Sequence, residues 1–218
     1  MPIRIQSSHA HDDRGLDAYF TCTEAVQAFL RLEADHLPLC IWEPAAGDGA
    51  IVKPLRKAGH IVFASDIADY GLGGCEIADY LRTPVIDGVE GIVTNPPYQL
   101  AEEFAKKAIA EVPYVALFVR TNWVMEGTAR GKWLDAHPPT REWRSAQRFP
   151  MMHRHGWQGP RSTSNTPYAW IVWQRGAPQE VARRFYWREL LKGLPPKLPF
   201  EPTYPGPGRT DPSDYMRD

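Results

Sequence analysis

Residues Leu39-Cys40-Ile41-Trp42-Glu43-Pro44-Ala45-Ala46-Gly47-Asp48-Gly49 join a short apolar strand to a turn that carries two glycines. A helix is predicted at about residues 50–58, with Gly59 as its stop, and the apolar run 61–66 is predicted as the next strand. A strand that leads through a glycine turn into a helix and then a second strand is the repeating unit of an α/β sheet.

The same alternation continues along the chain in both directions. Before the first strand, Val26, Phe29 and Leu30 lie at helical spacing after Thr21, which is expected to form a capping box with Glu24. Further strands are predicted at 91–94, 114–119, 141–149 and 168–173, and further helices at about 101–111, 124–136 and 179–191. The strands at 141–149 and 168–173 are expected to pair antiparallel. We therefore predict an α/β fold in which helices cover both faces of a mostly parallel sheet.

Length and composition favour one soluble globular domain. The chain of 218 residues is expected to consist of a flexible N-terminus at 1–15, a single domain at 16–192 and a Pro/Gly-rich tail at 193–218. Its hydrophobic fraction of 43% and charged fraction of 23% are ordinary for soluble proteins. No apolar run is long enough to span a bilayer, and the first residues lack the apolar stretch of a secretory signal.

Cysteine and histidine usage indicates a reducing compartment and predicts no metal site. Cys22, Cys40 and Cys75 are widely spaced and form no Cys-x-x-Cys motif, which argues against a disulfide framework or a zinc site. His153 and His155 stand two residues apart without an acidic or cysteine neighbour, so they give little support to metal binding. We expect a cytoplasmic protein.

Charge is divided unevenly between the two halves of the chain. The formal net charge is −1, yet residues 1–119 carry 9 Lys and Arg against 17 Asp and Glu, and residues 120–218 carry 16 against 9. A basic half that faces a polyanion would explain this pattern, and an uneven solvated surface would explain it equally well.

The turn after the first strand predicts a nucleoside site that lacks phosphates. Ligands of parallel sheets bind at the carboxyl ends of the strands, where Gly47 and Gly49 allow a tight turn and a close approach of the backbone. Asp66 ends the second strand 23 residues after Glu43, where a carboxylate can accept both hydroxyls of a ribose. Glu43 and Asp48 would repel a pyrophosphate but tolerate the cationic sulfonium and amino group of S-adenosylmethionine. The alternative is a glycine turn without a ligand.

The tetrapeptide Asn95-Pro96-Pro97-Tyr98 follows the predicted strand 91–94 directly. The Asn95 side-chain oxygen and the Pro96 carbonyl can both accept hydrogen bonds from an exocyclic aromatic amine, which would localise the nitrogen lone pair. The two prolines fix the backbone so that both acceptors converge, and Tyr98 offers a flat face on which a base can stack. The alternative is a rigid Pro-Pro turn whose Asn95 caps the next helix.

These motifs, in this order, make the sequence resemble the adenine-specific (N6) DNA methyltransferases, in their small prophage-type form, within the Rossmann-like S-adenosylmethionine-dependent superfamily. The resemblance covers about residues 17–175. Asp17-Ala18-Tyr19-Phe20-Thr21-Cys22 matches the family's Asp-x-Tyr-x-Thr-Pro, which touches the methionine end of the cofactor, with Cys22 in place of proline. The acidic residue of Asp79-Tyr80-Leu81 matches the one that binds the cofactor's adenine amino group. The resemblance implies a seven-stranded, mostly parallel sheet whose last strand runs antiparallel.

The motifs and the resemblance together define a predicted site. The predicted catalytic residues are Asn95, Pro96, Pro97 and Tyr98. The predicted cofactor-binding residues are Tyr19, Thr21, Glu43, Pro44, Ala45, Gly47, Asp48, Gly49, Asp66, Ile67, Asp79, Tyr80 and Asn95. The predicted substrate-binding residues are Tyr98, Arg130, Arg154, Trp157 and Arg161, with Arg141 and Arg144 as further candidates for phosphate contacts.

The predicted partner is nucleic acid, with DNA favoured and RNA as the nearer alternative because the same pocket would accept adenine in either polymer. A protein-glutamine methyltransferase uses the same tetrapeptide on a side-chain amide, but such enzymes carry a helical N-terminal domain that the first 40 residues do not resemble. A degenerate domain that only binds a partner would have lost catalytic positions, whereas Asn95, Asp66 and Gly47 are all present.

Overall fold

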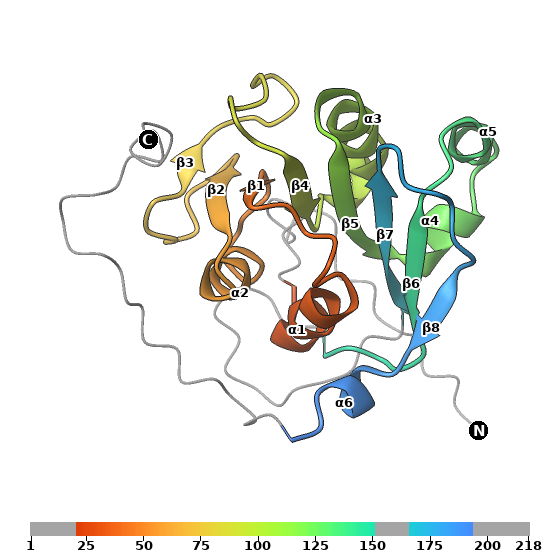
Figure 1. The fold of residues 1–218 in the computed structure, drawn as a ribbon. Helices are drawn as coiled ribbons and strands as arrows, with labels where there is room; N and C mark the ends of the chain where they lie inside the picture. The colour runs from red at the N-terminus through yellow and green to blue at the C-terminus, as the bar shows by residue number, and fades with distance from the viewer. Residues whose placement is uncertain (1–20, 151–165, 194–218) are drawn as a thin grey trace, which may run out of the picture.

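The computed structural model describes residues 21–150 and 166–193, so the N-terminus predicted to be flexible and nearly all of the predicted tail lie outside the described residues. Within the described part, eight strands form one sheet in the order β3-β2-β1-β4-β5-β7-β6-β8 (Figure 1). The strands are β1 (Cys40–Glu43), β2 (Ile61–Asp66), β3 (Glu76–Ile77), β4 (Gly91–Thr94), β5 (Tyr114–Arg120), β6 (Arg141–Ser145), β7 (Tyr168–Gln174) and β8 (Arg183–Phe185).

Only β7 runs against the other described strands. It pairs antiparallel with both β5 and β6, while every other neighbouring pair in the sheet is parallel. The predicted mostly parallel sheet and the predicted antiparallel pairing of the segments around 141 and 168 are therefore confirmed. The short strand β8, which lies beyond β6 at the edge of the sheet, is an addition to the seven strands that were expected.

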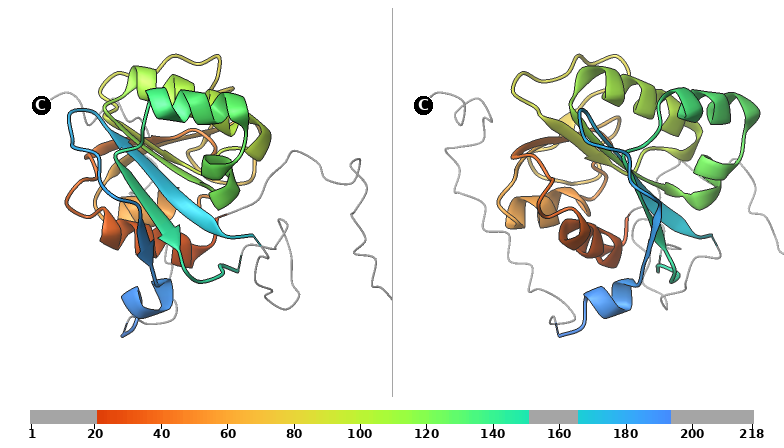
Figure 2. Two further views of the ribbon diagram at one scale, coloured as in Figure 1. Left: turned by 90° about the vertical axis from the view of Figure 1, so that its right-hand side faces the viewer. Right: turned by 45° about the vertical axis from the view of Figure 1, so that its right-hand side comes forward.

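Helices cover both faces of the sheet, as the sequence predicts. The helices are α1 (Thr23–Leu32), α2 (Val52–Lys57), α3 (Ala101–Glu111), α4 (Thr121–Met125), α5 (Thr128–Ala136) and α6 (Trp187–Leu190), with a short 3-10 helix η2 (Tyr98–Leu100). In Figure 2, α1 and α2 lie on one face, and α3, α4 and α5 lie on the other. None of the helices in residues 21–150 and 166–193 is long and apolar enough to cross a membrane.

The alternation of side chains along the strands builds one hydrophobic cluster on each face. Phe118 and Trp170 point towards α1, where Trp170 stacks on Phe29 with ring centroids 4.0 Å apart. Leu117 and Ile171, one residue away on the same strands, belong to the cluster on the α3 side. Burial on both faces explains why β5 and β7 are continuous apolar runs, and such runs are what the sequence analysis recognises as strands.

Three local predictions differ from the structure. The N-cap of α1 is Cys22, whose side chain makes no capping hydrogen bond, so the expected N-cap at Thr21 is wrong. The helix expected at 124–136 is two helices, α4 and α5, separated at Gly127, whose φ of 99° is incompatible with a continuous helix. The strand expected at 141–149 ends at Ser145.

The segment 179–191, predicted as one helix, instead forms β8 and the single turn α6. Arg183, Arg184 and Phe185 pair in parallel with β6, and of the three only Phe185 is buried. Phe185 is buried against Phe149, with ring centroids 6.1 Å apart. Pairing with the open edge of β6 therefore overrides the local helical preference of this segment.

A buried charge network ties α1 to the far strands of the sheet. Glu33, just after α1, is completely buried and accepts hydrogen bonds at 2.8 Å from both Nε and Nη2 of Arg141. The Tyr114 hydroxyl and the Trp143 indole nitrogen donate to the same carboxylate. Arg141 is only 3% exposed, so its predicted role as a phosphate contact is wrong, and it serves as the buried partner of Glu33.

Candidate functional site

The carboxyl ends of β1, β2, β4 and β5 meet at one edge of the sheet because these strands are parallel. The antiparallel strand β7 begins at this edge, where Tyr168 lies opposite Arg120, the last residue of β5. The edge therefore brings together the end of β1 at Glu43, the end of β2 at Asp66 and the tetrapeptide that follows β4.

The glycine turn after β1 is hydrogen-bonded to the end of β2. The backbone amide of Gly47 donates to Oδ2 of Asp66 at 2.8 Å, and the amide of Ala46 donates to the Ser65 carbonyl at 3.0 Å. Gly47 has a φ of 52° and Gly49 a φ of 83°, both in the region that favours glycine. A Cβ on Gly49 would also lie 2.7 Å from Cδ1 of Leu72. The sequence thus requires glycine at this turn for conformation and for space.

Glu43 is a buried carboxyl group beside this turn. Its Oε1 accepts a hydrogen bond from the Ala45 amide at 3.0 Å, and none of its surface is exposed. Burial raises the pKa of Glu43 to about 8; the Thr94 hydroxyl and the Ala45 amide oppose this shift, and the charge of Asp66 adds to it. Two carboxyl groups therefore share a buried corner of the edge, where Glu43 is mainly protonated at neutral pH and a cationic ligand would favour its ionised form.

The remaining predicted cofactor residues have different surroundings. Ile67 follows Asp66 and is 58% exposed, whereas Tyr80 is 2% exposed and packs in the core against Trp42 and Phe104. Asp79 follows β3 and lies near the end of β2, because the neighbouring Ala78 amide donates to the Asp66 carbonyl at 2.9 Å.

The side chains of Asp79 and Asp48 both serve their own loops. Asp79 accepts from the Leu81 amide at 3.0 Å and pairs with Arg82, and Asp48 accepts from the Ala50 amide at 3.1 Å. Thr21 is buried immediately before α1, Pro44 and Ala45 belong to the glycine turn, and Tyr19 lies outside the described residues.

The tetrapeptide lies at the end of β4, beside the glycine turn. Strands β1 and β4 are neighbours with Trp42 opposite Ile92, so Asn95 follows β4 at the level where the turn follows β1. Pro96 is buried, and the Pro97 carbonyl accepts from the Leu100 amide at 2.9 Å at the start of η2. The segment passes from a strand into a helix within four residues, which fixes the backbone at the predicted catalytic position.

Tyr98 belongs to a polar cluster with two residues that the sequence analysis did not select. Its hydroxyl is 2.8 Å from the hydroxyl of Tyr168, and the Arg120 guanidinium carbon lies 4.0 Å from the centroid of its ring. Burial, and then the neighbouring Tyr168, raises the pKa of Tyr98, so its phenol stays neutral at physiological pH. Their position beside Tyr98 depends on the antiparallel register of β5 and β7, which places Tyr168 opposite Arg120 and which the sequence analysis did not predict.

The predicted substrate-binding arginines have local partners. Arg130 donates to the Trp123 carbonyl at 2.6 Å and to the Glu126 carbonyl, and thereby closes the turn between α4 and α5. Arg144 is bound to Glu142 through Nε at 3.0 Å and Nη2 at 2.6 Å. The predicted residues Arg154, Trp157 and Arg161 lie outside the described residues.

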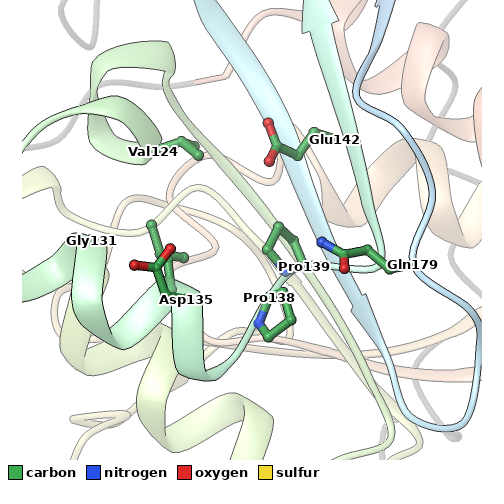
Figure 3. A pocket seen from close by; sticks show the side chains of 8 residues that line it. Val124, Gly131, Asp135, Pro138, Pro139, Glu142 and Gln179 are labelled. Carbon is green, nitrogen blue, oxygen red and sulfur yellow. The ribbon is translucent and has the colours of Figure 1, made fainter.

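A separate hollow lies between α5 and the start of β6 (Figure 3). It is lined by Gly131, Leu134 and Asp135 of α5, by Pro138 and Pro139, and by Glu142. None of the predicted catalytic or cofactor-binding residues lines this hollow, so the candidate site is the carboxyl edge of the sheet.

No protein-family model and no curated protein matches the sequence of this chain, but its fold is similar to those of solved methyltransferases. A proposed RNA methyltransferase from Pyrococcus horikoshii superposes with a TM-score of 0.58 at 15% identity, covering 73% of this chain and 88% of that one. The methyltransferase subunit of a type I restriction-modification system from Streptococcus thermophilus gives a TM-score of 0.53 at 13% identity, covering 72% and 45%. The M protein of the type I restriction enzyme EcoKI gives 0.54 at 12% identity, covering 74% and 44%.

This chain spans less than half the length of the two type I subunits that it resembles. What it shares with all three proteins is the Rossmann-like methyltransferase fold, which the sequence predicted.

Proposed function

We propose that this protein is an S-adenosylmethionine-dependent methyltransferase that acts on the exocyclic N6 amino group of adenine in DNA. The observation that carries the proposal is the meeting of two motifs at one sheet edge: the glycine turn bonded to Asp66, and Asn95–Tyr98 at the end of the adjacent strand. A cofactor held at the first motif would face a substrate held at the second.

The residues at the glycine turn fit this cofactor by their chemistry. The carboxyl groups of Glu43 and Asp66 suit the cationic ends of S-adenosylmethionine, and the exposed Ile67 offers an apolar surface for its adenine. Each carboxylate oxygen has two acceptor lone pairs, so Asp66 can bind ribose hydroxyls while it keeps the amide of Gly47. When bound, the cofactor supplies an electrophilic methyl group.

The tetrapeptide supplies the groups that the acceptor nitrogen needs. The amine of adenine is a weak nucleophile because its lone pair is delocalised into the ring. The Asn95 side-chain oxygen and the Pro96 carbonyl would accept its two hydrogens, and the proton would leave after the new carbon–nitrogen bond has formed. Tyr98 would hold the flipped base by stacking, which is worth about 1–3 kcal/mol in comparable sites.

DNA is the favoured polymer because the motif order resembles that of adenine-specific DNA methyltransferases. The type I subunits with a similar fold belong to DNA restriction systems, whereas the Pyrococcus horikoshii protein is described as acting on RNA. RNA therefore stays the second candidate. A cytoplasmic location is part of the proposal, and it agrees with the lack of a disulfide at Cys22, Cys40 and Cys75 in the described residues.

Transfer of labelled methyl from S-adenosylmethionine to duplex DNA, single-stranded DNA, RNA and protein, measured in parallel, tests the proposal. We expect label in DNA, recovered as N6-methyladenine after digestion. Label in RNA alone would replace the polymer and keep the chemistry, whereas label in protein glutamine would overturn the adenine assignment.

A further inference from the structure

Arg120 carries a positive charge that no acidic group in the described residues neutralises. It ends β5 at the site edge and is half-buried, and its Nε is buried without a hydrogen-bond partner among residues 21–150 and 166–193. The buried or half-buried arginines nearby differ, because Arg141 is paired with Glu33 and Arg144 with Glu142. A half-buried guanidinium without a carboxylate is suited to bind an anion.

Two tyrosines hold this guanidinium in place. The guanidinium carbon lies 4.0 Å from the centroid of the Tyr98 ring, and Tyr168 lies opposite Arg120 across the pairing of β5 with β7. The hydroxyls of the two tyrosines are bonded to each other at 2.8 Å, and the ring of Tyr168 stacks on Phe118 with centroids 5.1 Å apart. Both partners are phenols, so they orient the charge of Arg120 and do not neutralise it.

The position of Arg120 relates this charge to the substrate. The base proposed to stack on Tyr98 is joined through its sugar to two phosphates, so capture of the base brings a phosphate close to the same ring. On the cofactor side of the edge the acidic groups are Glu43 and Asp66, and the carboxylate of Asp66 does not attract a phosphate. The anion that this part of the site can accept is therefore a phosphodiester of the polynucleotide.

We propose that Arg120 is a substrate-binding residue that contacts a phosphate adjacent to the target adenine, and that Tyr168 is a positioning residue that holds Arg120 and Tyr98 together. This inference rests on the proposed function, because it assumes that the base captured at Tyr98 belongs to DNA. In this arrangement the base stacks on Tyr98 while the adjacent Arg120 contacts the DNA backbone.

The salt dependence of DNA binding is the first test. Arg120→Gln should weaken binding to duplex DNA about tenfold or more at low salt, and should reduce the slope of log affinity against log salt by about 0.9, the value for one lost phosphate contact. Arg175→Gln is the matched control, because Arg175 lies after β7 at the opposite edge of the sheet, and it should keep the wild-type slope. Melting temperature and S-adenosylmethionine affinity are measured for both variants.

A single neutral methylphosphonate next to the methylated adenine identifies the phosphate. In an oligonucleotide that the wild type methylates, this substitution at the contacted position should weaken wild-type binding about tenfold. The same methylphosphonate should not weaken DNA binding by the Arg120→Gln variant any further, because that variant has already lost the contact. An equal penalty in both proteins at each flanking phosphate would overturn the proposal.

Tyr168→Phe separates positioning from charge. It removes the hydroxyl that is bonded to the Tyr98 hydroxyl beside Arg120, so KM for DNA should rise several-fold. The salt slope should stay at the wild-type value, because the charge of Arg120 remains. Arg120→Lys should likewise keep the slope and lose affinity, because a lysine does not reproduce the stacked, bidentate group.

The outcomes distinguish the inference from the proposed function. A folded Arg120→Gln protein with wild-type DNA affinity and slope overturns the inference and leaves methyl transfer untouched. If Arg120→Gln changes the salt slope of DNA binding as expected but the wild type transfers no methyl group, only the proposed function is overturned. A wild type whose affinity for DNA does not depend on salt contradicts both.

Discussion

Asn95 lies at the end of β4 between the buried residues Thr94 and Pro96, so the backbone fixes it on both sides. Asn95→Ala would remove one of the two acceptors proposed to localise the amine lone pair without altering the glycine turn. We expect the rate of methyl transfer to fall about 10²–10³-fold, with unchanged S-adenosylmethionine affinity. Single-turnover methylation of DNA beside calorimetric titration of the cofactor measures both quantities.

Gln99→Ala is the control for this change, since its side chain is exposed in η2, four residues further along the chain. It should retain most of the wild-type rate. Near-normal turnover by Asn95→Ala would contradict the catalytic interpretation of the tetrapeptide.

Glu43 should give the protein a pH-dependent stability. Burial raises the pKa of its carboxyl to about 8 in the folded protein, against about 4.3 in an unfolded chain. Between these values the folded state binds more protons than the unfolded state, so the stability that Glu43 contributes is full below the lower value and is lost as pH rises towards 8. Glu43→Gln stays neutral at every pH. The melting temperature of the wild type should therefore fall relative to that of Glu43→Gln from pH 5 to pH 8 and then level off. If the difference in melting temperature between the two proteins does not change with pH, the prediction is wrong.

At the scale of the elements, the central strands were predictable and the edge of the sheet was not. Strands β1, β2, β4, β5 and β7 are buried apolar runs, which a sequence shows directly. β3 is two exposed residues, and β8 is a strand only because it pairs with β6. Such pairings depend on which neighbour is in reach, and local patterns do not contain that information.

The candidate site divides in the same way. The meeting of the glycine turn, Asp66 and the tetrapeptide at one edge was predictable, because each directly follows or ends a strand that the sequence predicts. Arg120 and Tyr168 were not selected because their contact depends on the register of two strands that are distant in sequence. Arg141 was misjudged for a related reason, since its partner Glu33 is separated from it by 108 positions.

The Glu33 network should carry much of the stability that joins α1 to β6. Glu33→Ala removes both hydrogen bonds to the buried guanidinium of Arg141, which keeps only the Gln174 side-chain oxygen at 2.7 Å and the more distant carboxylate of Glu180 at 3.9 Å among its described partners. We expect a loss of about 3–5 kcal/mol in the free energy of unfolding, measured by urea denaturation. Glu103→Ala, on the exposed side of α3, should change it by about 0.5 kcal/mol or less. Equal losses in the two variants would mean that the network contributes little.

At the scale of the whole molecule, β8 and α6 add a basic edge to the sheet. Residues 183–193 contain four Lys or Arg and one Glu, and Arg184, Arg188 and Lys192 are exposed. Strand β8 is parallel to β6, so its end faces the same edge as the candidate site. Phe185 contacts Phe149, which lies 5.8 Å from Phe118 in the strand that ends at Arg120.

Neutralising this basic edge should weaken DNA binding without affecting the cofactor. Arg184→Gln with Lys192→Gln should reduce the salt slope by roughly 1.8 if both residues contact phosphates. The control pair, Lys57→Gln with Lys132→Gln, removes two exposed charges from α2 and α5 and should keep the slope. Binding isotherms at several salt concentrations compare the two pairs, and identical slopes would exclude β8 and α6 from the DNA interface.

The antiparallel strand β7 gives the chain a natural position for variation in length. Arg144 of β6 lies opposite Ala169 of β7, so the chain leaves the sheet and re-enters it at two adjacent points. The residues after the buried Phe149 and before Tyr168 can be lengthened, shortened or exchanged without shifting the register of either strand, and both ends stay at the edge that holds Asn95 and Asp66. Related proteins could therefore acquire new target preferences by exchanging this connection alone, and a chimaera that carries a foreign connection here should fold on an unchanged core.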